Sequence, residues 1–395
     1  MEPSDLRIAL FSGNYNYVRD GANQALNRLV GYLLRQGAHV RVYSPVRDKP
    51  AFPPTGDLVN VPSIAVPSRP EYRIPSYLSA AVRADIEAFA PNIVHVSSPD
   101  VVAHRAVSWA RAKGIPAVAS VHTRFEMYLR YYGLSWFEPG FRALLRRFYR
   151  RCDAIVAPAE STAAVLHAQR MSRDISIWGR GVDREQFNPR RRSMKWRRAN
   201  GMKDDEMVVA FLGRIVMEKG LDVFVGAVNA AVERKVRHRV LVIGDGPARA
   251  WFEANLPAGT MFVGAQTGDD LAVALASADV FLNPSITEAF GNVTQEAMAC
   301  GLPVVAALAT GATSLVRDGV TGILVDPLQP DQYGEALARY AADPALRARH
   351  GNAGLDFAKT RDWDAINADV MKLYTRVIER RARMDALYGK RWLPS

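Results

Sequence analysis

The sequence predicts an α/β protein with two doubly wound domains, each a parallel sheet covered by helices. Three observations predict this class. Short apolar runs of strand length alternate with stretches of helical period, which favours parallel sheets with helices on both faces. The alternation restarts near residue 207, after a charged, proline-led segment at 189–198 that is typical of a linker. The chain has 395 residues, more than one hydrophobic core usually organises.

The first domain begins with a strand, helix, strand unit. RIALFS (7–12) predicts a buried strand, and a polar, glycine-containing loop then leads into a helical pattern at 22–37. Since stretches of helical period separate the later apolar runs, we expect parallel strands at 39–44, 92–98, 116–123 and 153–158.

The second domain repeats the alternation with six expected strands, at 207–214, 239–247, 261–265, 279–285, 303–307 and 322–327. The tail from about 362 to 383 has apolar residues at helical spacing, so its helix needs an apolar surface to cover. We therefore predict a first domain at 1–187, a second at 188–361 and a helical tail at 362–395.

Composition and charge restrict the class of protein. Hydrophobic residues make up 49% and charged residues 23%, as in ordinary soluble proteins, and no apolar run approaches the roughly 20 residues of a membrane-spanning helix. The first residues do not resemble a secretory signal, and the two cysteines are too few for a disulfide framework, so a cytoplasmic location is expected.

The positive charge lies mainly in the first half of the chain. Residues 1–185 hold 24 Lys and Arg against 16 Asp and Glu, whereas the remainder holds 27 against 24. A basic surface can serve nucleic acid, anionic lipid or acidic substrates. Because no zinc finger, helix-turn-helix or aromatic RNA signature accompanies the charge, we expect no nucleic-acid partner.

The most informative segment is SITEAFGNVTQEA (285–297), which reads as a strand exit, a turn with Gly291 and a helix that starts near Asn292. Backbone N–H groups at such a helix start bind phosphate oxygens, and the helix dipole favours the anion. Glu288 and Glu296 would flank the phosphate site, one holding hexose hydroxyls and the other ribose. The alternative is a capping carboxylate at Glu288 and a solvated helix residue at Glu296.

A second element is FLGRIVMEKG (211–220), where Arg214 follows a predicted strand and Lys219 opens the next helix. Two cations at a strand exit suit a diphosphate, whose growing negative charge they would neutralise as it leaves. The alternative is an ordinary solvated basic turn. The sequence offers no convincing cluster of metal ligands, so no metal site is expected.

Other candidates also lie directly after predicted strands, where ligands bind in parallel sheets. His122 could hydrogen-bond a sugar hydroxyl or position the acceptor, although a lone histidine is often structural. Gly13 and Gly21 belong to the loop after the first strand, and Gly244 belongs to GDGP (244–247). Glycines of this kind let a backbone approach a ligand, but a tight turn explains Gly244 nearly as well.

Taken together, these motifs resemble the family 4 glycosyltransferases. The likeness runs along essentially the whole chain: the Glu-x7-Glu spacing of Glu288 and Glu296, then ACGLPVVA, GR followed by EKG at 213–220, GDGP, HT at 122–123 and GVDREQFNP at 181–189. The resemblance implies the GT-B fold, in which two Rossmann-like domains face a cleft and a last helix crosses back to the first domain. It also implies a UDP- or GDP-sugar donor, retention of anomeric configuration, and no cofactor or required metal.

The resemblance also implies roles for individual residues. Arg214 and Lys219 match the diphosphate binders, and Glu288 matches the residue that holds the donor sugar. The donor-binding stretch continues through Ala289, Phe290, Gly291, Asn292 and Val293, the last three at the β-phosphate, to Glu296 at the ribose. The chain departs from the family at Gly311-Ala312, where many members have two glycines.

Within the family, HTRFEMYLRYYG (122–133), the segment 178–192 and the tail 362–374 look most like sulfoquinovosyldiacylglycerol synthases and related mannosyltransferases, which glycosylate membrane lipids. The segment FRALLRRFYRR (141–151) could lie on an anionic membrane, with apolar side chains in the lipid and arginines at the phosphates. It could equally bury its apolar stripe in its own domain. The likeness to lipid-glycosylating enzymes, together with the basic first half, leads us to expect a lipid acceptor and peripheral contact with the inner membrane face. Alternatives are a soluble or polysaccharide acceptor, a sugar-nucleotide epimerase, a phosphorylase and a non-enzymatic basic binding protein.

Overall fold

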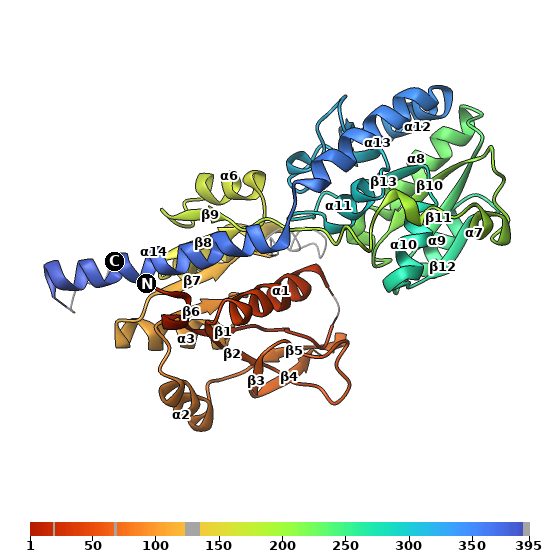
Figure 1. The fold of residues 1–395 in the computed structure, drawn as a ribbon. Coiled ribbons are helices and arrows are strands. Elements are labelled where there is room, and N and C mark those ends of the chain that lie inside the picture. The colour runs from red at the N-terminus through yellow and green to blue at the C-terminus, as the bar shows by residue number, and fades with distance from the viewer. Residues whose placement is uncertain (19, 67–68, 123–134, 390–395) are drawn as a thin grey trace. The chain divides into compact units, whose positions relative to one another are not determined.

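The computed structural model describes residues 1–18, 20–66, 69–122 and 135–389 (Figure 1). Contacts divide the chain into two compact units. The first unit comprises Met1–Arg180 together with the segment that begins at Trp363, and the second comprises Gly181–Asp362. The sequence-based limits at 187/188 and 361/362 differ from these breaks by seven residues and by one.

The described part of the first unit forms a seven-stranded parallel sheet in the order β3-β2-β1-β6-β7-β8-β9. Its strands are β1 (Arg7–Phe11), β2 (His39–Ser44), β3 (Asp57–Asn60), β6 (Ile93–Val96), β7 (Ala117–Ser120), β8 (Ala154–Ala157) and β9 (Ile175–Ile177). All five predicted strands are present. The sequence reasoning missed β3, β9 and the antiparallel pair β4 (Ser63–Val66) and β5 (Arg69–Pro75), which are short or contain proline.

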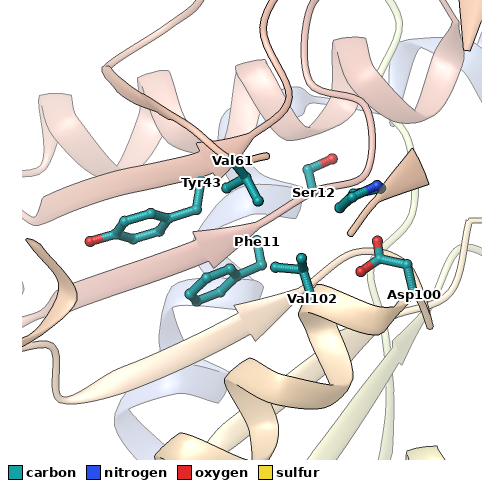
Figure 2. Close-up of a pocket in the computed structure, with 7 residues that line it drawn as sticks. Phe11, Ser12, Tyr43, Val61, Asp100 and Val102 are labelled. Carbon is teal, nitrogen blue, oxygen red and sulfur yellow. The ribbon is translucent and has the colours of Figure 1, made fainter. Parts of the chain in front are cut away.

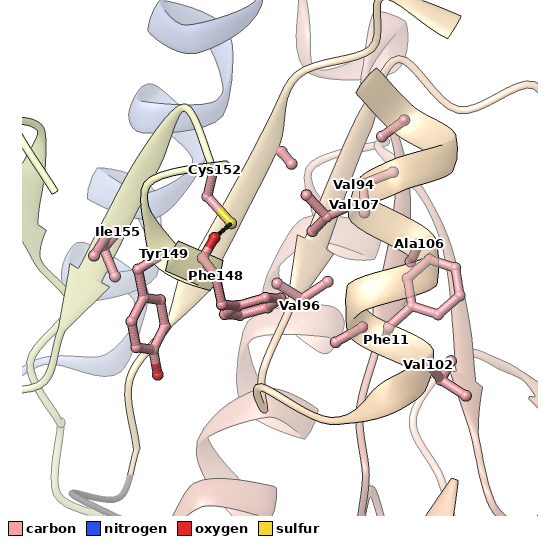
Figure 3. Close-up of a cluster of buried hydrophobic side chains, with 14 of the residues drawn as sticks. Phe11, Val94, Val96, Val102, Ala106, Val107, Phe148, Tyr149, Cys152 and Ile155 are labelled. Atoms are coloured by element: carbon pink, nitrogen blue, oxygen red, sulfur yellow. Dashed lines mark hydrogen bonds between the residues drawn. The ribbon is translucent and has the colours of Figure 1, made fainter. Parts of the chain in front are cut away.

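Two apolar layers cover this sheet. One contains side chains of α3 (Val101–Lys113) and α5 (Glu138–Tyr149), as Figure 3 shows for Val102, Ala106 and Phe148. The other contains side chains of α1 (Gly21–Arg35) and α14 (Trp363–Tyr388), including Leu29 and Tyr374. The unit also includes α2 (Ala80–Phe89) and α6 (Glu160–Ala168).

The predicted tail helix is α14, and it packs against α1 of the first unit. Its Arg376 and Arg380 both form ion pairs with Asp174, at 2.8 and 2.6 Å, which add to the apolar contact. The prediction that the last helix returns to the first domain is therefore confirmed.

The second unit forms a six-stranded parallel sheet in the order β12-β11-β10-β13-β14-β15. All six predicted strands are present, as β10 (Met207–Leu212), β11 (His238–Ile243), β12 (Met261–Gly264), β13 (Val280–Asn283), β14 (Val304–Ala307) and β15 (Gly322–Val325). The helices are α8 (Leu221–Glu233), α9 (Arg249–Asn255), α10 (Gly268–Ala276), α11 (Asn292–Ala299), α12 (Pro330–Ala342) and α13 (Pro344–Lys359). The predicted α/β class with two Rossmann-like sheets is confirmed.

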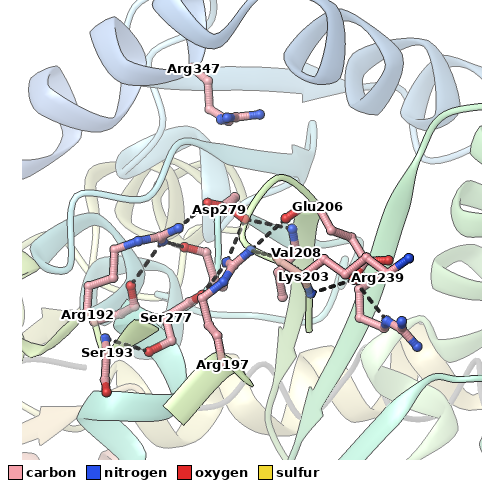
Figure 4. Close-up of polar contacts among 12 residues, drawn as sticks. Arg192, Ser193, Arg197, Lys203, Glu206, Val208, Arg239, Ser277, Asp279 and Arg347 are labelled. Atoms are coloured by element: carbon pink, nitrogen blue, oxygen red, sulfur yellow. Dashed lines mark hydrogen bonds and ion pairs between the residues drawn. The ribbon is translucent and has the colours of Figure 1, made fainter. Parts of the chain in front are cut away.

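The segment at 189–198 is not a free linker. It contains α7 (Met194–Ala199), and Figure 4 shows how its arginines are fixed to the second unit. The buried Arg197 donates to Asp279 Oδ2 at 2.9 Å and to the carbonyls of Ser277 and Glu206, while Arg192 reaches Asp279 Oδ1 at 2.7 Å. A carboxylate that receives two guanidinium groups offsets the cost of burying them, which composition alone could not reveal.

In the part of the chain that the structure describes, no helix is both long enough and apolar enough to cross a membrane.

Candidate functional site

The loops after β10 and β13 meet through an ion pair. These strands are neighbours in the sheet, so their carboxyl ends lie at the same edge. Lys219, at the end of a single 3-10 turn after β10, donates from Nζ to Oε1 of Glu288 at 2.5 Å. The two side chains are 31% and 17% exposed, so the contact is partly shielded from water. The Lys219 ammonium and the Glu288 carboxylate thus lie together at the carboxyl edge of the sheet, where ligands bind in parallel sheets.

Further contacts fasten the loop that carries Glu288. Thr287 donates from Oγ1 to the carbonyl of Glu218 at 2.9 Å, next to Lys219. Asn283, the last residue of β13, accepts from the Ser285 amide at 3.2 Å and donates to Thr294 Oγ1 at 2.9 Å. The two loops and the first turn of α11 are therefore held together by direct hydrogen bonds.

The predicted helix start is observed at α11. Gly291 precedes it with a φ of 98°, in the left-handed region that favours glycine. The amides of Thr294 and Gln295 donate to the Gly291 carbonyl, so Asn292 and Val293 supply the first-turn amides that lie outside the intrahelical pattern. The neighbouring Ala289 and Phe290 are buried, and Glu296 lies partly buried one turn into the helix. This is the geometry of an anion-binding helix terminus.

Gly311 touches the backbone of Glu288. A Cβ atom at position 311 would lie 2.6 Å from the Glu288 carbonyl oxygen, which is closer than real contacts allow. Ala312, where the sequence departs from the family resemblance, is buried. The chain therefore keeps glycine at the one of the two positions that the Glu288 loop requires.

Gly244 packs against the backbone of the loop that carries Arg214. A Cβ atom at Gly244 would lie 1.9 Å from the carbonyl oxygen of Gly213, and the Ile215 amide donates to the Asp245 carbonyl at 2.9 Å. The GDGP turn and the turn after β10 are thus packed backbone against backbone. This contact explains the glycine by itself, and a role toward nucleotide stays a prediction.

In the first unit, Gly13 lies against two acceptors after β6. Its amide donates to Ser98 Oγ at 3.2 Å, and a Cβ atom there would lie 3.1 Å from Asp100 Oδ2. Figure 2 shows Ser12 and Asp100 among the residues that line a small space at the end of β1. Gly21 opens α1, whose capping residue is Asp20. Burial raises the pKa of Asp20 and of Asp100, both of which the sequence reasoning passed over.

His122 follows β7, and both of its ring nitrogens already have partners. Arg180 Nη2 lies 2.9 Å from Nδ1, and Ser120 Oγ lies 2.8 Å from Nε2. Burial, and then the charge of Arg180, lower the pKa of His122 well below its usual value. The predicted contact with a sugar hydroxyl therefore requires the hydroxyl to share or replace one of these partners. The sequence reasoning did not single out Arg180.

His95, which the sequence analysis left without a functional role, is completely buried beside the same serine. Its Nε2 lies 2.8 Å from Ser120 Oγ, and its Nδ1 is hydrogen-bonded to the hydroxyl of Tyr374 on α14. Burial lowers the pKa of His95 to about 3. Within the described ranges, no three His, Cys, Asp or Glu side chains gather into a group that could hold a metal ion.

Comparisons with known proteins show which family the chain belongs to. Residues 19–186 match the family described as Glycosyltransferase Family 4, and residues 206–343 match glycosyl transferases group 1. A GDP-mannose-dependent alpha-mannosyltransferase of Mycolicibacterium smegmatis is 32% identical over 384 residues, which cover 95% of this chain and 99% of that protein. The chain belongs to glycosyltransferase family 4. The predicted family and the predicted enzyme class, a glycosyltransferase, are confirmed.

Two further comparisons agree with this glycosyltransferase assignment. The sulfoquinovosyl transferase SQD2 of Arabidopsis thaliana is 31% identical over 376 residues, which cover 92% of this chain and 72% of that protein. The structure of Anabaena HepE in complex with UDP aligns with a TM-score of 0.74 at 18% identity, over 94% of this chain and all of that one. At this identity the structural likeness concerns the fold, and it supports the predicted GT-B class.

Most side chains of the basic segment at 141–151 pack or form hydrogen bonds within the first unit. Leu145, Phe148 and Tyr149 are buried in the core of the first unit. Arg146 and Arg150 donate from Nε to backbone carbonyls at 3.0 and 3.1 Å. The apolar stripe therefore has the domain-core role that was one of the two interpretations.

Among the described residues on α5 and directly before it, three large apolar side chains are exposed. Trp136 is 76% exposed and Leu144 is 51% exposed, and Phe137 lies exposed beside Trp136. The preceding segment HTRFEMYLRYYG, on which the narrower lipid-enzyme likeness drew, lies outside the described residues from 123 onward.

Proposed function

We propose that this glycosyltransferase moves a hexose-type sugar from a UDP- or GDP-sugar to an acceptor hydroxyl, with retention of anomeric configuration and without a required metal. The observation that carries the proposal is the Lys219–Glu288 contact beside the start of α11. It offers a cation and amide donors for a diphosphate and a carboxylate for sugar hydroxyls. The GDP-mannose dependence of the mycobacterial relative and the UDP bound to HepE support a nucleotide-sugar donor.

The two ends of the donor are assigned to different groups. Arg214 and Lys219 bind the diphosphate, and the amides of Asn292 and Val293 receive a β-phosphate oxygen. Glu288 holds hexose hydroxyls. A carboxylate so near a phosphate would repel it, and Lys219 removes that repulsion because its ammonium already contacts Glu288.

At the other end of the donor, Glu296 holds the ribose hydroxyls from within α11. Glu296, within α11, thus binds the nucleoside, and Glu288, before the turn at Gly291, binds the sugar. In the second unit, Gly244 would allow the backbone to approach the nucleotide closely, and Gly13 and Gly21 would do the same for a ligand of the first unit.

The proposed chemistry is a front-face displacement. The acceptor hydroxyl attacks the anomeric carbon from the side that the leaving diphosphate occupies, and an oxygen of that phosphate takes the hydroxyl proton. Arg214, Lys219 and the α11 amides stabilise the departing charge, and one such donor is worth about 3 to 4 kcal/mol of barrier. Glu288 orients the sugar in this scheme, and its pairing with Lys219 supports that role over a nucleophilic one.

We further propose a membrane lipid as the acceptor, met at the inner face of the cytoplasmic membrane. Support comes from the basic first half of the chain and from exposed Trp136, Phe137 and Leu144, which lie close in sequence to arginines. A soluble or polysaccharide acceptor is the alternative.

The donor and acceptor are tested together. The purified protein is incubated with radiolabelled GDP-mannose, UDP-glucose or UDP-sulfoquinovose, and with a membrane lipid extract or a soluble sugar acceptor. The proposal expects label in the organic phase with one donor, and equal transfer with and without a chelator. Label only in water-soluble product would establish the alternative acceptor. Abolition by chelator and rescue by magnesium would contradict metal independence.

A further inference from the structure

A continuous line of buried polar contacts runs from Arg180 to the last helix. Arg180 Nη2 lies 2.9 Å from His122 Nδ1, and His122 Nε2 lies 2.8 Å from Ser120 Oγ. Ser120 Oγ lies 2.8 Å from His95 Nε2, and His95 Nδ1 contacts the hydroxyl of Tyr374 on α14. Except for the partly exposed His122, these side chains are buried.

The chemistry of arginine determines which atom donates and which accepts in each hydrogen bond of this line. A guanidinium group has only N–H donors, so the His122 nitrogen that faces it must accept. The Nδ1 atom therefore carries a lone pair, the ring is neutral, and its one proton is on Nε2. That proton is donated to Ser120 Oγ, whose own proton is then available to His95 Nε2.

Arg180 is itself held tightly. Its Nη1 donates to the carbonyls of Trp178 and Gly179 at 2.7 and 2.9 Å. Its guanidinium carbon lies 4.6 Å from the centroid of the Trp178 ring, and the Trp178 indole N–H donates to Asn367 on α14 at 3.1 Å. The helix α14 thus supports His122 along two routes, one through Trp178 and Arg180 and one through Tyr374 and His95.

We infer that Arg180 is a positioning residue that fixes His122 as a neutral ring with its proton on Nε2, so that a substrate oxygen that shares or replaces the Ser120 contact meets a hydrogen-bond donor there and not a general base. The inference deepens the proposed function and rests on it for the role of His122 in transfer. It fits a reaction in which a phosphate oxygen, and not a histidine, takes the acceptor proton. The fold connects this feature to α14, which returns from the far end of the sequence.

The direct test is the ¹⁵N NMR spectrum of the protein labelled at its histidine rings, with His122→Gln used to assign the His122 signals. The inference expects the neutral form with the proton on Nε2, unchanged between about pH 5 and 8, where an ordinary histidine titrates. In Arg180→Met the ring should lose this fixed tautomer and carry its proton on either nitrogen, and Arg180→Lys, which again has only donors, should restore it. A wild-type ring that is protonated on Nδ1, or that titrates in this range, would overturn the inference.

Activity provides the second readout. Arg180→Met should lower kcat about tenfold, equal to about 1.4 kcal/mol, with a donor KM changed less than about twofold. Arg7→Met is the matched control. Arg7 is the first residue of β1, its guanidinium also lies over a ring, that of Phe89, and it also donates to backbone carbonyls, those of Phe89 and Ala90. It should leave kcat and the His122 signals unchanged. If Arg180→Met leaves the His122 signals as in the wild type, Arg180 is not the positioning residue.

A wild-type spectrum without the fixed Nε2–H form overturns the inference even if Arg180→Met does not fold. The two hypotheses also fail separately. If the spectrum shows the fixed Nε2–H form but His122→Gln and Arg180→Met both retain wild-type kcat, the positioning stands and the role of His122 in transfer is wrong.

Discussion

The Lys219–Glu288 pair makes a prediction that can be worked out from its geometry. Lys219→Met removes the ammonium group that lies 2.5 Å from Glu288 Oε1. The diphosphate then loses one cation and also faces a carboxylate that is no longer neutralised. Losing one preorganised charge-stabilising donor costs about 3 to 4 kcal/mol, so kcat/KM should fall about 10² to 10³-fold. Because the pair is partly exposed, its own contribution to folding should be small, about 1 kcal/mol.

A double-mutant cycle separates the two effects. Glu288→Gln should bind the free nucleotide diphosphate as well as the wild type or better, because one negative charge is gone, while sugar transfer falls. In the double variant, nucleotide affinity should partly recover relative to Lys219→Met, with a coupling energy of about 0.5 to 3 kcal/mol. Titration calorimetry with UDP and GDP measures affinity, and a radiolabel transfer assay measures kcat/KM.

The matched control is Lys359→Met, because Lys359 forms an ion pair with Asp356 at 2.8 Å on the exposed surface of the same unit. It should change neither quantity more than about twofold. The reasoning is refuted if Lys219→Met behaves like this control, or if Glu288→Gln weakens the nucleotide as much as Lys219→Met does.

Three further predictions follow from separate features. Gly311→Ala should lower the melting temperature and should lower kcat/KM at least about tenfold, because its Cβ atom would press on the Glu288 carbonyl. Circular dichroism measures the first effect and the transfer assay the second. Burial lowers the pKa of His95 to about 3, so the folded state excludes a proton that the unfolded state binds below about pH 6.5. The stabilisation is complete above that pH and is lost toward pH 3, at up to about 1.4 kcal/mol per pH unit. The unfolding free energy of His95→Gln should lack this part of the slope in urea titrations, and an identical slope would refute it. Trp136→Ser should reduce flotation with anionic liposomes, whereas Leu328→Ser, at an 87% exposed position in the other unit, should not; equal flotation of both variants would remove the basis for a membrane surface there.

The sequence predicted the sheets well because buried parallel strands are nearly continuous apolar runs. Strand β10, for example, is MVVAFL, and a run of this length is typical of a buried strand, because helices are usually longer. Strands β4 and β5 escaped prediction because they form an exposed or proline-containing hairpin without that signal. The segment with Arg197 looked like a linker because its charges suggest solvent. The contact of Arg197 with Asp279, 82 residues later, and its hydrogen bonds to backbone carbonyls account for the burial of this one arginine.

The candidate site was predictable where its signal is local. Gly291 and the start of α11 follow from a short motif, as does the placement of Arg214 and Lys219 after a strand. The contact between Lys219 and Glu288 spans 69 residues and could be expected only through the order of strands.

The environment of His122 could not be predicted in the same way. Arg180 lies 58 residues away in sequence, and Tyr374 reaches the same serine–histidine line from 279 residues beyond His95. Such contacts have no periodic or spacing signal. The Tyr374 contact exists because α14 folds back on the first unit, and the Arg180 contact because the chain passes His122 again after β9.

The most direct test of the account is the anomeric configuration of the first-formed product. Transfer from an α-linked nucleotide sugar is followed by ¹H NMR in the presence of a chelator, before any product can mutarotate. The account predicts an α-linked product formed at the same rate as without chelator. A β-linked product, or release of an altered sugar without transfer to any acceptor, would contradict it.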